Sequence, residues 1–105
     1  MGKSQARELE SRLRVLLLRL LKWRCQPEKR SRGWQFTIDT QRAELSGLLR
    51  QSPSLLHLLP DSIPVVYRHA VRGAAIQTGL PTRTFPAGCP FAVEQILDED
   101  FLPES

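Results

Sequence analysis

An uninterrupted leucine-rich segment near the start of the chain constrains the fold more than any other feature. No proline or glycine occurs from residue 4 to residue 24, and Ser4 is a residue type that caps helices. Apolar residues recur three and four positions apart and form one stripe: Leu9, Leu13, Leu16, Leu17, Leu20 and Trp23. The segment 4–24 is therefore predicted to be a long helix whose stripe is buried.

The rest of the chain also has helical periodicity and contains no convincing strand. Apolar stripes and boundary residues predict helices at about 34–51, 53–59, 63–78 and 92–98. Pro60 is expected to end the short helix, and Gly79 to end the next one in the left-handed conformation. One domain over residues 1–105 fits this length. The prediction is all-α: a small irregular bundle of three main helices, a short C-terminal helix and an extended tail.

Two apolar residues of the first helix lie away from its stripe. Val15 and Leu18 fall on the opposite side, which also carries Arg7, Arg14 and Lys22. A helix that is apolar on both sides is usually covered on both sides. We expect the tail, a second copy or a partner protein to cover this face. The first functional hypothesis is therefore a protein–protein interaction or self-associating module that uses Val15 and Leu18.

Charge is distributed unevenly along the chain. Residues 1–33 hold ten Lys and Arg against three Glu, while residues 80–105 hold one Arg against five acids. Such segments attract partners of opposite charge, or remain solvated on opposite faces of one fold. The alternative hypothesis is a nucleic-acid-binding accessory protein that uses the basic 22–32 segment, namely Lys22, Arg24, Lys29, Arg30 and Arg32. Trp23 and Trp34 could stack on bases, but both lie on predicted core stripes, which favours packing.

The side chains that carry catalysis or bind metals do not form a recognisable motif. Cys25 and Cys89 lie far apart in sequence, and neither His57 nor His69 flanks a cysteine at zinc-site spacing. Residues 98–100 are acidic but lack the alternation and central glycine of a calcium loop. No catalytic residue, metal or cofactor is predicted. Reduced thiols and the lack of an apolar run of about 20 residues predict a cytoplasmic protein without a membrane span.

A polar residue on the second stripe needs a separate explanation. Gln41 lies in the middle of the apolar stripe of segment 34–51. A buried amide needs hydrogen-bond partners, and a neighbouring helix is the simplest source of one. We expect Gln41 to form a hydrogen bond between two helices.

An ordered set of short stretches resembles the bacterial family called domain of unknown function 29. The stretches cover about residues 9–103: Leu20-Leu21-Lys22-Trp23, Gln26-Pro27-Glu28 with basic residues up to Trp34, Gln41-Arg42, Ser52-Pro53-Ser54-Leu55, Thr78-Gly79-Leu80-Pro81, Phe85-Pro86, Cys89-Pro90, and Leu97-Asp98 through Phe101-Leu102-Pro103. The resemblance implies an all-helical fold and no established activity, so it transfers no functional residue.

The chain departs from the family pattern in two places. The resemblance implies a further helical segment upstream in most family members; we expect this chain to be without it, which would expose the face with Val15 and Leu18. Ala92 stands where the family usually has Thr or Ser. We expect this change to remove a capping pair with Gln95, at a cost of about 1 kcal/mol to the last helix.

Overall fold

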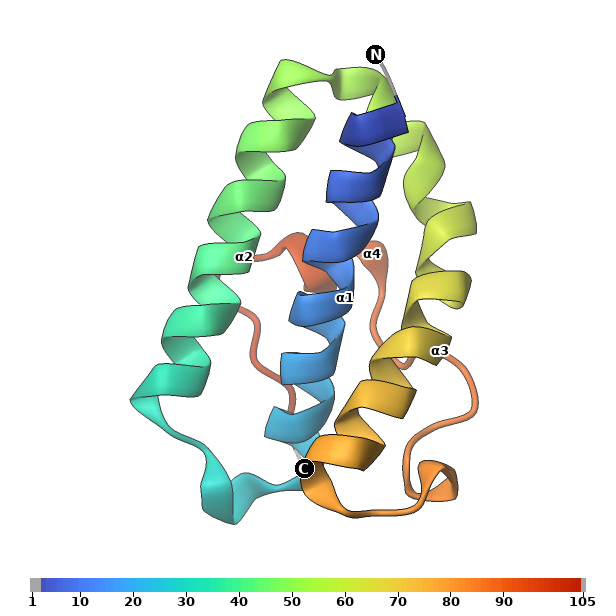
Figure 1. Ribbon diagram of the computed structural model, residues 1–105. Helices are drawn as coiled ribbons and strands as arrows, with labels where there is room; N and C mark the ends of the chain where they lie inside the picture. The colour runs from blue at the N-terminus through green and yellow to red at the C-terminus, as the bar shows by residue number, and fades with distance from the viewer. Residues whose placement is uncertain (1–2, 105) are drawn as a thin grey trace.

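Three long helices and one short helix make up the fold. The structure is a computed structural model that describes residues 3–104. The long helices are α1 (Lys3–Cys25), α2 (Arg32–Gln51) and α3 (Leu59–Thr78), and the short one is α4 (Val93–Leu97). In Figure 1, α1 stands between α2 and α3, and α4 crosses behind them. The predicted all-α bundle is confirmed, and residues 3–104 include no strand.

Helix α1 supplies the centre of the core because it packs against both other long helices. Six of its leucines are completely buried: Leu9, Leu13, Leu16, Leu17, Leu20 and Leu21. The same cluster contains the stripes of α2 and α3: Ile38, Leu45, Leu48, Ile63, Val66, Tyr67, Ala70 and Ala74. Burying one leucine side chain contributes about 1.5–3 kcal/mol, so the predicted stripes are the main source of stability.

Capping residues are expected to mark helix starts, and the starts of α2 and α1 both differ from the prediction. The helix expected from residue 34 begins at Arg32, because the Ser31 side chain accepts a hydrogen bond from the Trp34 amide at 3.1 Å. It follows the short 3-10 helix η1 (Pro27–Lys29). Helix α1 is already helical at Lys3, so Ser4 lies inside it instead of capping it.

Pro60 does not end a helix, contrary to the prediction. The 3-10 helix η2 (Pro53–Leu58) leads directly into α3, which begins at Leu59 rather than at residue 63. Pro60 is therefore the second residue of α3, where a missing N–H is harmless because the first four amides of a helix have no intrahelical acceptor. Gly79 ends α3 as predicted, with φ 75° and its amide donating to the Ala75 carbonyl at 2.9 Å.

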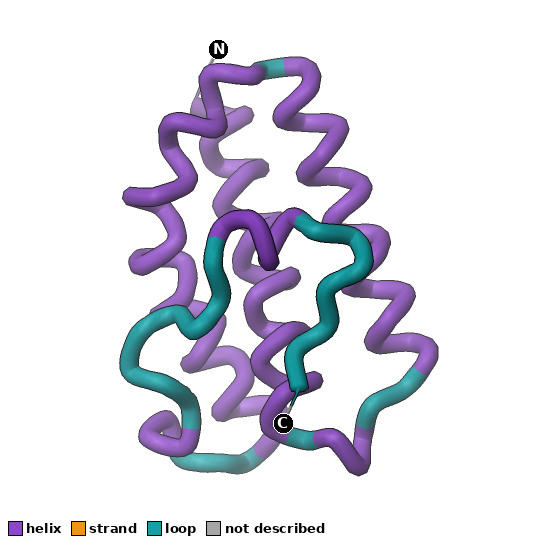
Figure 2. Tube along the Cα trace, turned by 180° about the vertical axis from the view of Figure 1, so that it is seen from behind, coloured by secondary structure: helices purple, strands orange, loops and turns teal. Residues whose placement is uncertain are grey.

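Residues 80–104 form a C-terminal strap across the back of the bundle, as Figure 2 shows. The strap is mostly loop, with the short helices η3 (Thr82–Thr84) and α4. The Tyr67 hydroxyl of α3 donates to the Pro86 carbonyl at 2.6 Å. Phe91 and Phe101 pack edge to face with ring centroids 6.1 Å apart. These contacts attach the strap to α3 and bring its two halves together.

Arg42 of α2 holds the second half of the strap. Its side chain is 3% exposed. Nε donates to the Ile96 carbonyl at 2.9 Å, Nη1 to that of Phe101 at 2.8 Å, and Nη2 to that of Gln95 at 3.1 Å. The last carbonyls of a helix have no intrahelical donor, so Arg42 satisfies the end of α4. Burial lowers the pKa of Arg42, against the effect of nearby Asp98, Asp39 and Glu99.

The cap of α4 corrects a further expectation. The Gln95 side chain still accepts a hydrogen bond from the Ala92 amide at 2.9 Å. The methyl group of Ala92 has no acceptor atom, so only the reciprocal half of the capping box is missing. The helix spans Val93–Leu97, slightly less than the predicted 92–98. The substitution of alanine therefore leaves the Gln95 pairing in place.

Candidate protein-interaction groove

A groove runs along the surface between α1 and α3. It consists of two adjoining hollows of about 260 Å³ and 410 Å³, both lined by Arg14 and His69. The first hollow extends to Arg7, and the second to Arg19. We call this surface the α1/α3 groove and define it by the lining residues within 7–19 of α1 and 65–77 of α3.

The two predicted interaction residues both line the larger hollow. Val15 and Leu18 are half-buried, because α3 approaches α1 closely at Gly73. A Cβ atom at Gly73 would lie 2.7 Å from Cδ1 of Leu18, so a larger residue there requires the Leu18 side chain to move. From the sequence, the tail, a second copy or a partner was expected to cover Leu18. Within the chain, α3 contacts it instead, and both side chains remain partly open to solvent.

The charged residues of the groove are mostly basic. Arg7 and Arg14 are exposed and Arg19 is half-buried, while Glu10 is the acidic residue in the lining. His69 is exposed and belongs to both hollows. Apolar side chains with arginine beside them are typical of the centre of a protein interface, where arginine is enriched and lysine depleted.

Lys22 closes one end of this region and is not free for a ligand. Its side chain is 8% exposed, and Nζ donates to Oε1 of Gln77 at 3.0 Å. The ammonium also lies 4.7 Å from the ring centroid of Trp34. Burial lowers the pKa of Lys22, and Arg19 and Lys29 lower it further. Lys22, a predicted nucleic-acid contact, therefore joins α1 to α3 through Gln77 and to α2 through Trp34.

The other four residues of the basic 22–32 segment divide into two groups. Arg30 donates from Nε to the Trp23 carbonyl at 2.7 Å and from Nη2 to the Pro103 carbonyl at 3.4 Å. Its guanidinium lies 5.2 Å from the Trp23 ring centroid. Arg24 is half-buried, whereas Lys29 and Arg32 are exposed. Both tryptophans are half-buried beside a cation, and Trp23 packs on the core, as its place on the stripe predicted.

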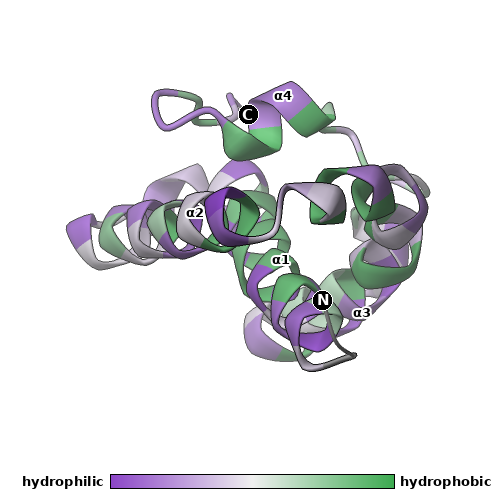
Figure 3. Ribbon diagram, turned by 90° about the horizontal axis from the view of Figure 1, so that it is seen from above, coloured by the Kyte–Doolittle hydropathy of each residue, from purple (hydrophilic) through white to green (hydrophobic). Residues whose placement is uncertain are grey.

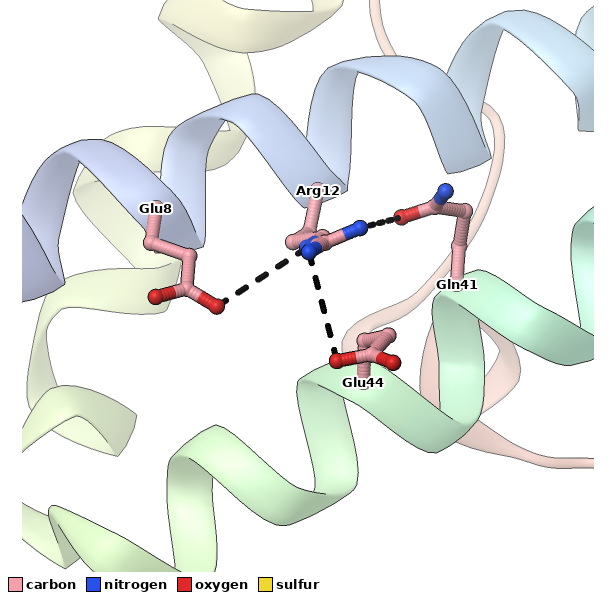
Figure 4. Close-up of polar contacts among 4 residues, drawn as sticks. All are labelled: Glu8, Arg12, Gln41 and Glu44. Carbon is pink, nitrogen blue, oxygen red and sulfur yellow. Dashed lines mark hydrogen bonds and ion pairs between the residues drawn. The ribbon is translucent and has the colours of Figure 1, made fainter.

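Gln41 forms the predicted hydrogen bond between helices, shown in Figure 4. Its Oε1 accepts from Nη1 of Arg12 at 3.5 Å. The Arg12 guanidinium also lies 3.9 Å from a carboxylate oxygen of Glu8 and 4.0 Å from one of Glu44. These side chains are only partly buried, so each ion pair contributes little. The cluster has a structural role between α1 and α2.

A surface of opposite charge lies on α2 and the strap. Asp39, Asp98 and Glu99 are exposed and lie near Arg42. Phe36, 72% exposed, lines a hollow of about 300 Å³ with Asp39 and Glu99. We call these four residues the acidic face. No prediction for Phe36 was drawn from the sequence. Its position off the apolar stripe of α2 is the feature that could have predicted its exposure.

Cysteine chemistry has little support from the surroundings of the two thiols. Cys25 and Cys89 are both free and half-buried. Burial raises the pKa of each thiol, which disfavours the reactive thiolate. Among residues 3–104, no three His, Cys, Asp or Glu side chains form a group that could hold a metal ion.

The family comparison agrees with the stretches identified in the sequence. A family model described as domain of unknown function DUF29 matches residues 1–102. The chain belongs to the DUF29 family. No curated protein and no solved structure matches the chain.

The stretches that resemble the DUF29 family account for the fold better than for a site. Arg42 binds the strap, Gly79 ends α3, and the Cys89 thiol donates to the Phe91 carbonyl at 3.6 Å. Val15 and Leu18 lie outside every one of these stretches. Within the described part of the chain, none of the helices combines the length and apolar character needed to cross a membrane.

Proposed function

We propose that this DUF29 chain is a protein–protein interaction module whose docking surface is the α1/α3 groove. The observation that carries the proposal is the position of Val15 and Leu18, half-buried in a hollow flanked by Arg14 and Arg19. A partner side chain that fills the hollow would remove this apolar surface from water, at about 25 cal/mol per Å². The arginines would orient an acidic partner.

The chemistry of the groove favours a macromolecular partner over a substrate. Small-molecule sites are usually enclosed and converge a few polar groups on one point. Here the arginines are distributed along α1 between positions 7 and 19, about 18 Å at the rise of a helix. A cytoplasmic location is part of the proposal, because free Cys25 and Cys89 fit a reducing compartment.

Affinity capture with matched variants tests this proposal. The immobilised chain is incubated with nuclease-treated lysate of its source cell, as wild type and as Arg14→Glu/Arg19→Glu. Arg50→Glu/Arg83→Glu, which changes two exposed arginines outside the groove by the same charge, is the control. We expect specific proteins to bind to the wild type and control and to be lost from the groove variant. Equal capture by all three would refute docking in the groove.

A nucleic-acid-binding role is the second candidate, and one observation favours it. Arg19 and Lys29 both lower the pKa of Lys22, so cations from α1 and η1 lie close together. Exposed Lys29 and Arg32 could neutralise phosphates next to them. Lys22 and Arg30, however, make contacts within the chain, which reduces the cations available from the predicted five.

A salt series separates this candidate from the first. Lys29→Glu/Arg32→Glu removes two exposed cations without touching Arg30, whose substitution would also release the strap. If nucleic acid is the ligand, labelled single- or double-stranded probes should bind at low salt and lose affinity in this variant. The slope of log affinity against log salt should fall by about 2. Absence of any shift with wild type at low salt ends this candidate.

A further inference from the structure

We infer that the α1/α3 groove binds the acidic face of a second copy of the chain. This inference rests on the proposed function, because it requires the groove to be a protein-docking surface. The groove combines Val15 and Leu18 with three arginines and one glutamate. The partner it selects must therefore present an apolar side chain beside carboxylates.

The acidic face has this composition. Phe36 is 72% exposed, and a phenyl ring in water is the kind of apolar surface that interfaces cover. Asp39 and Glu99 line the same hollow as Phe36. Arg32 and buried Arg42 offset part of this charge, but the strap carries five acids against one arginine. The face thus offers an aromatic anchor with the carboxylates of Asp39 and Glu99 beside it.

The two surfaces cannot meet within one chain, because they belong to different sides of the bundle. The groove lies on α1 and α3, whereas the acidic face lies on α2 and the strap. Figure 1 shows α4 behind α1, and Figure 3 places α4 on one side of the bundle with the start of α1 on the other. Within one molecule the groove and the acidic face do not neutralise each other. The acidic face of a second molecule can do so.

A contact between unlike surfaces has a definite consequence for assembly. In a pair, one copy keeps an unused acidic face and the other keeps an unused groove, so further copies add until a ring closes or a filament forms. Because the charges are exposed, the contact weakens as salt shortens the screening length from about 10 Å at 0.1 M to about 3 Å at 1 M.

Sedimentation velocity over a concentration series measures this assembly directly. At low salt the wild type should sediment as species larger than a monomer, with an average size that rises with concentration and falls with added salt. Arg14→Glu/Arg19→Glu reverses the charge of two groove arginines, and Phe36→Lys/Glu99→Gln removes the anchor and one acid. All four positions are exposed or half-buried, so circular dichroism should show unchanged helix content. Each variant alone should be a monomer.

Mixing the two variants provides the decisive result. The groove variant keeps an intact acidic face, and the acidic-face variant keeps an intact groove, so an equimolar mixture contains one productive contact per pair. The mixture should form a 1:1 dimer that does not grow further. Controls with the same charge changes elsewhere are Arg50→Glu/Arg83→Glu and Leu56→Lys/Asp61→Asn, at exposed positions, and both should assemble like the wild type.

Three outcomes overturn the inference, and they are distinct from failure of the proposed function. A wild type that is monomeric at every concentration excludes self-association. An acidic-face variant that still assembles points to a contact between two grooves. A mixture that stays monomeric shows that an intact groove does not bind an intact acidic face. In each case, groove-dependent capture of other proteins would leave the docking role of the groove standing.

Discussion

Arg42 on α2 and Arg14 on α1 are the same residue type in opposite surroundings. Arg42 is 3% exposed and donates to three carbonyls of the strap. Arg14 is exposed and lines two hollows that also contain apolar side chains. The first arginine completes the fold, because buried acceptors need donors. The second leaves its donors available, as a docking surface requires. Burial and partners, rather than residue type, separate the structural arginine from the one proposed for docking.

The largest expected effect on the free energy of unfolding comes from replacing the buried arginine that holds the strap. Arg42→Ala leaves the carbonyls of Gln95, Ile96 and Phe101 without their donor. At about 1–3 kcal/mol for each unsatisfied buried acceptor, the free energy of unfolding should fall by roughly 3 kcal/mol or more. Urea unfolding followed by circular dichroism measures the loss. Arg14→Ala is the matched control and should change stability by less than about 0.5 kcal/mol. Similar losses in both would contradict the assigned roles.

A pH titration tests the attachment of the strap to α3. Burial, mainly, raises the pKa of Tyr67 from 10.0 to about 12. The folded state therefore holds the phenolic proton more tightly than the unfolded state. The resulting contribution to the free energy of unfolding is fully present below pH 10. This contribution should be lost as pH rises from 10 through 12, by about 3 kcal/mol in total at about 1.36 kcal/mol for each of the two pKa units.

The measurement is specific because Tyr67 is the only tyrosine in the chain. Its ultraviolet absorbance reports the ionisation, and urea midpoints at each pH report stability. Tyr67→Phe should remove this part of the pH dependence, while losing about 1 kcal/mol at neutral pH with the hydrogen bond to Pro86. A tyrosine that titrates near pH 10 in the folded protein would disprove the assignment.

The smallest expected effect on stability comes from Gly73→Ala, which tests the contact between α3 and Leu18 in the groove. In Gly73→Ala the new methyl displaces the end of the Leu18 side chain, which is half-buried and can move outward. Alanine also gains about 0.5–1 kcal/mol of helix propensity over glycine. The net change in unfolding free energy should stay below about 1 kcal/mol, while partner capture by the groove decreases. A large loss of stability would show that Leu18 belongs to a rigid core.

The fold was predictable where the signal was local. The apolar stripes identified the buried faces of α1, α2 and α3, because burial follows the helical period. Pro60 was misassigned, because a proline has the same local sequence whether it stops one helix or occupies the first turn of the next. The cap at Ser31 was also missed, which moved the start of α2 by two residues.

The site was predictable only in part, because its decisive contacts are distant in sequence. Val15 and Leu18 were identified as unusual from their own helix, but nothing nearby reveals that Gly73 approaches Leu18. The acceptors of Arg42 lie 53, 54 and 59 positions away, and backbone carbonyls carry no residue-specific signal. Lys22 and Arg30 looked like free cations for the same reason, since Gln77 and Pro103 are their partners.

The grip of Arg42 on the strap has a consequence for synthesis on the ribosome. The three long helices are complete once residue 78 has been translated, but the guanidinium must wait for the carbonyl of Phe101. Until then the part of the bundle that the strap covers stays open to water, with the Arg42 guanidinium beside it. Exposed apolar surface of this kind favours aggregation or binding to a chaperone. The second half of the strap therefore reaches Arg42 only after the helices have been translated.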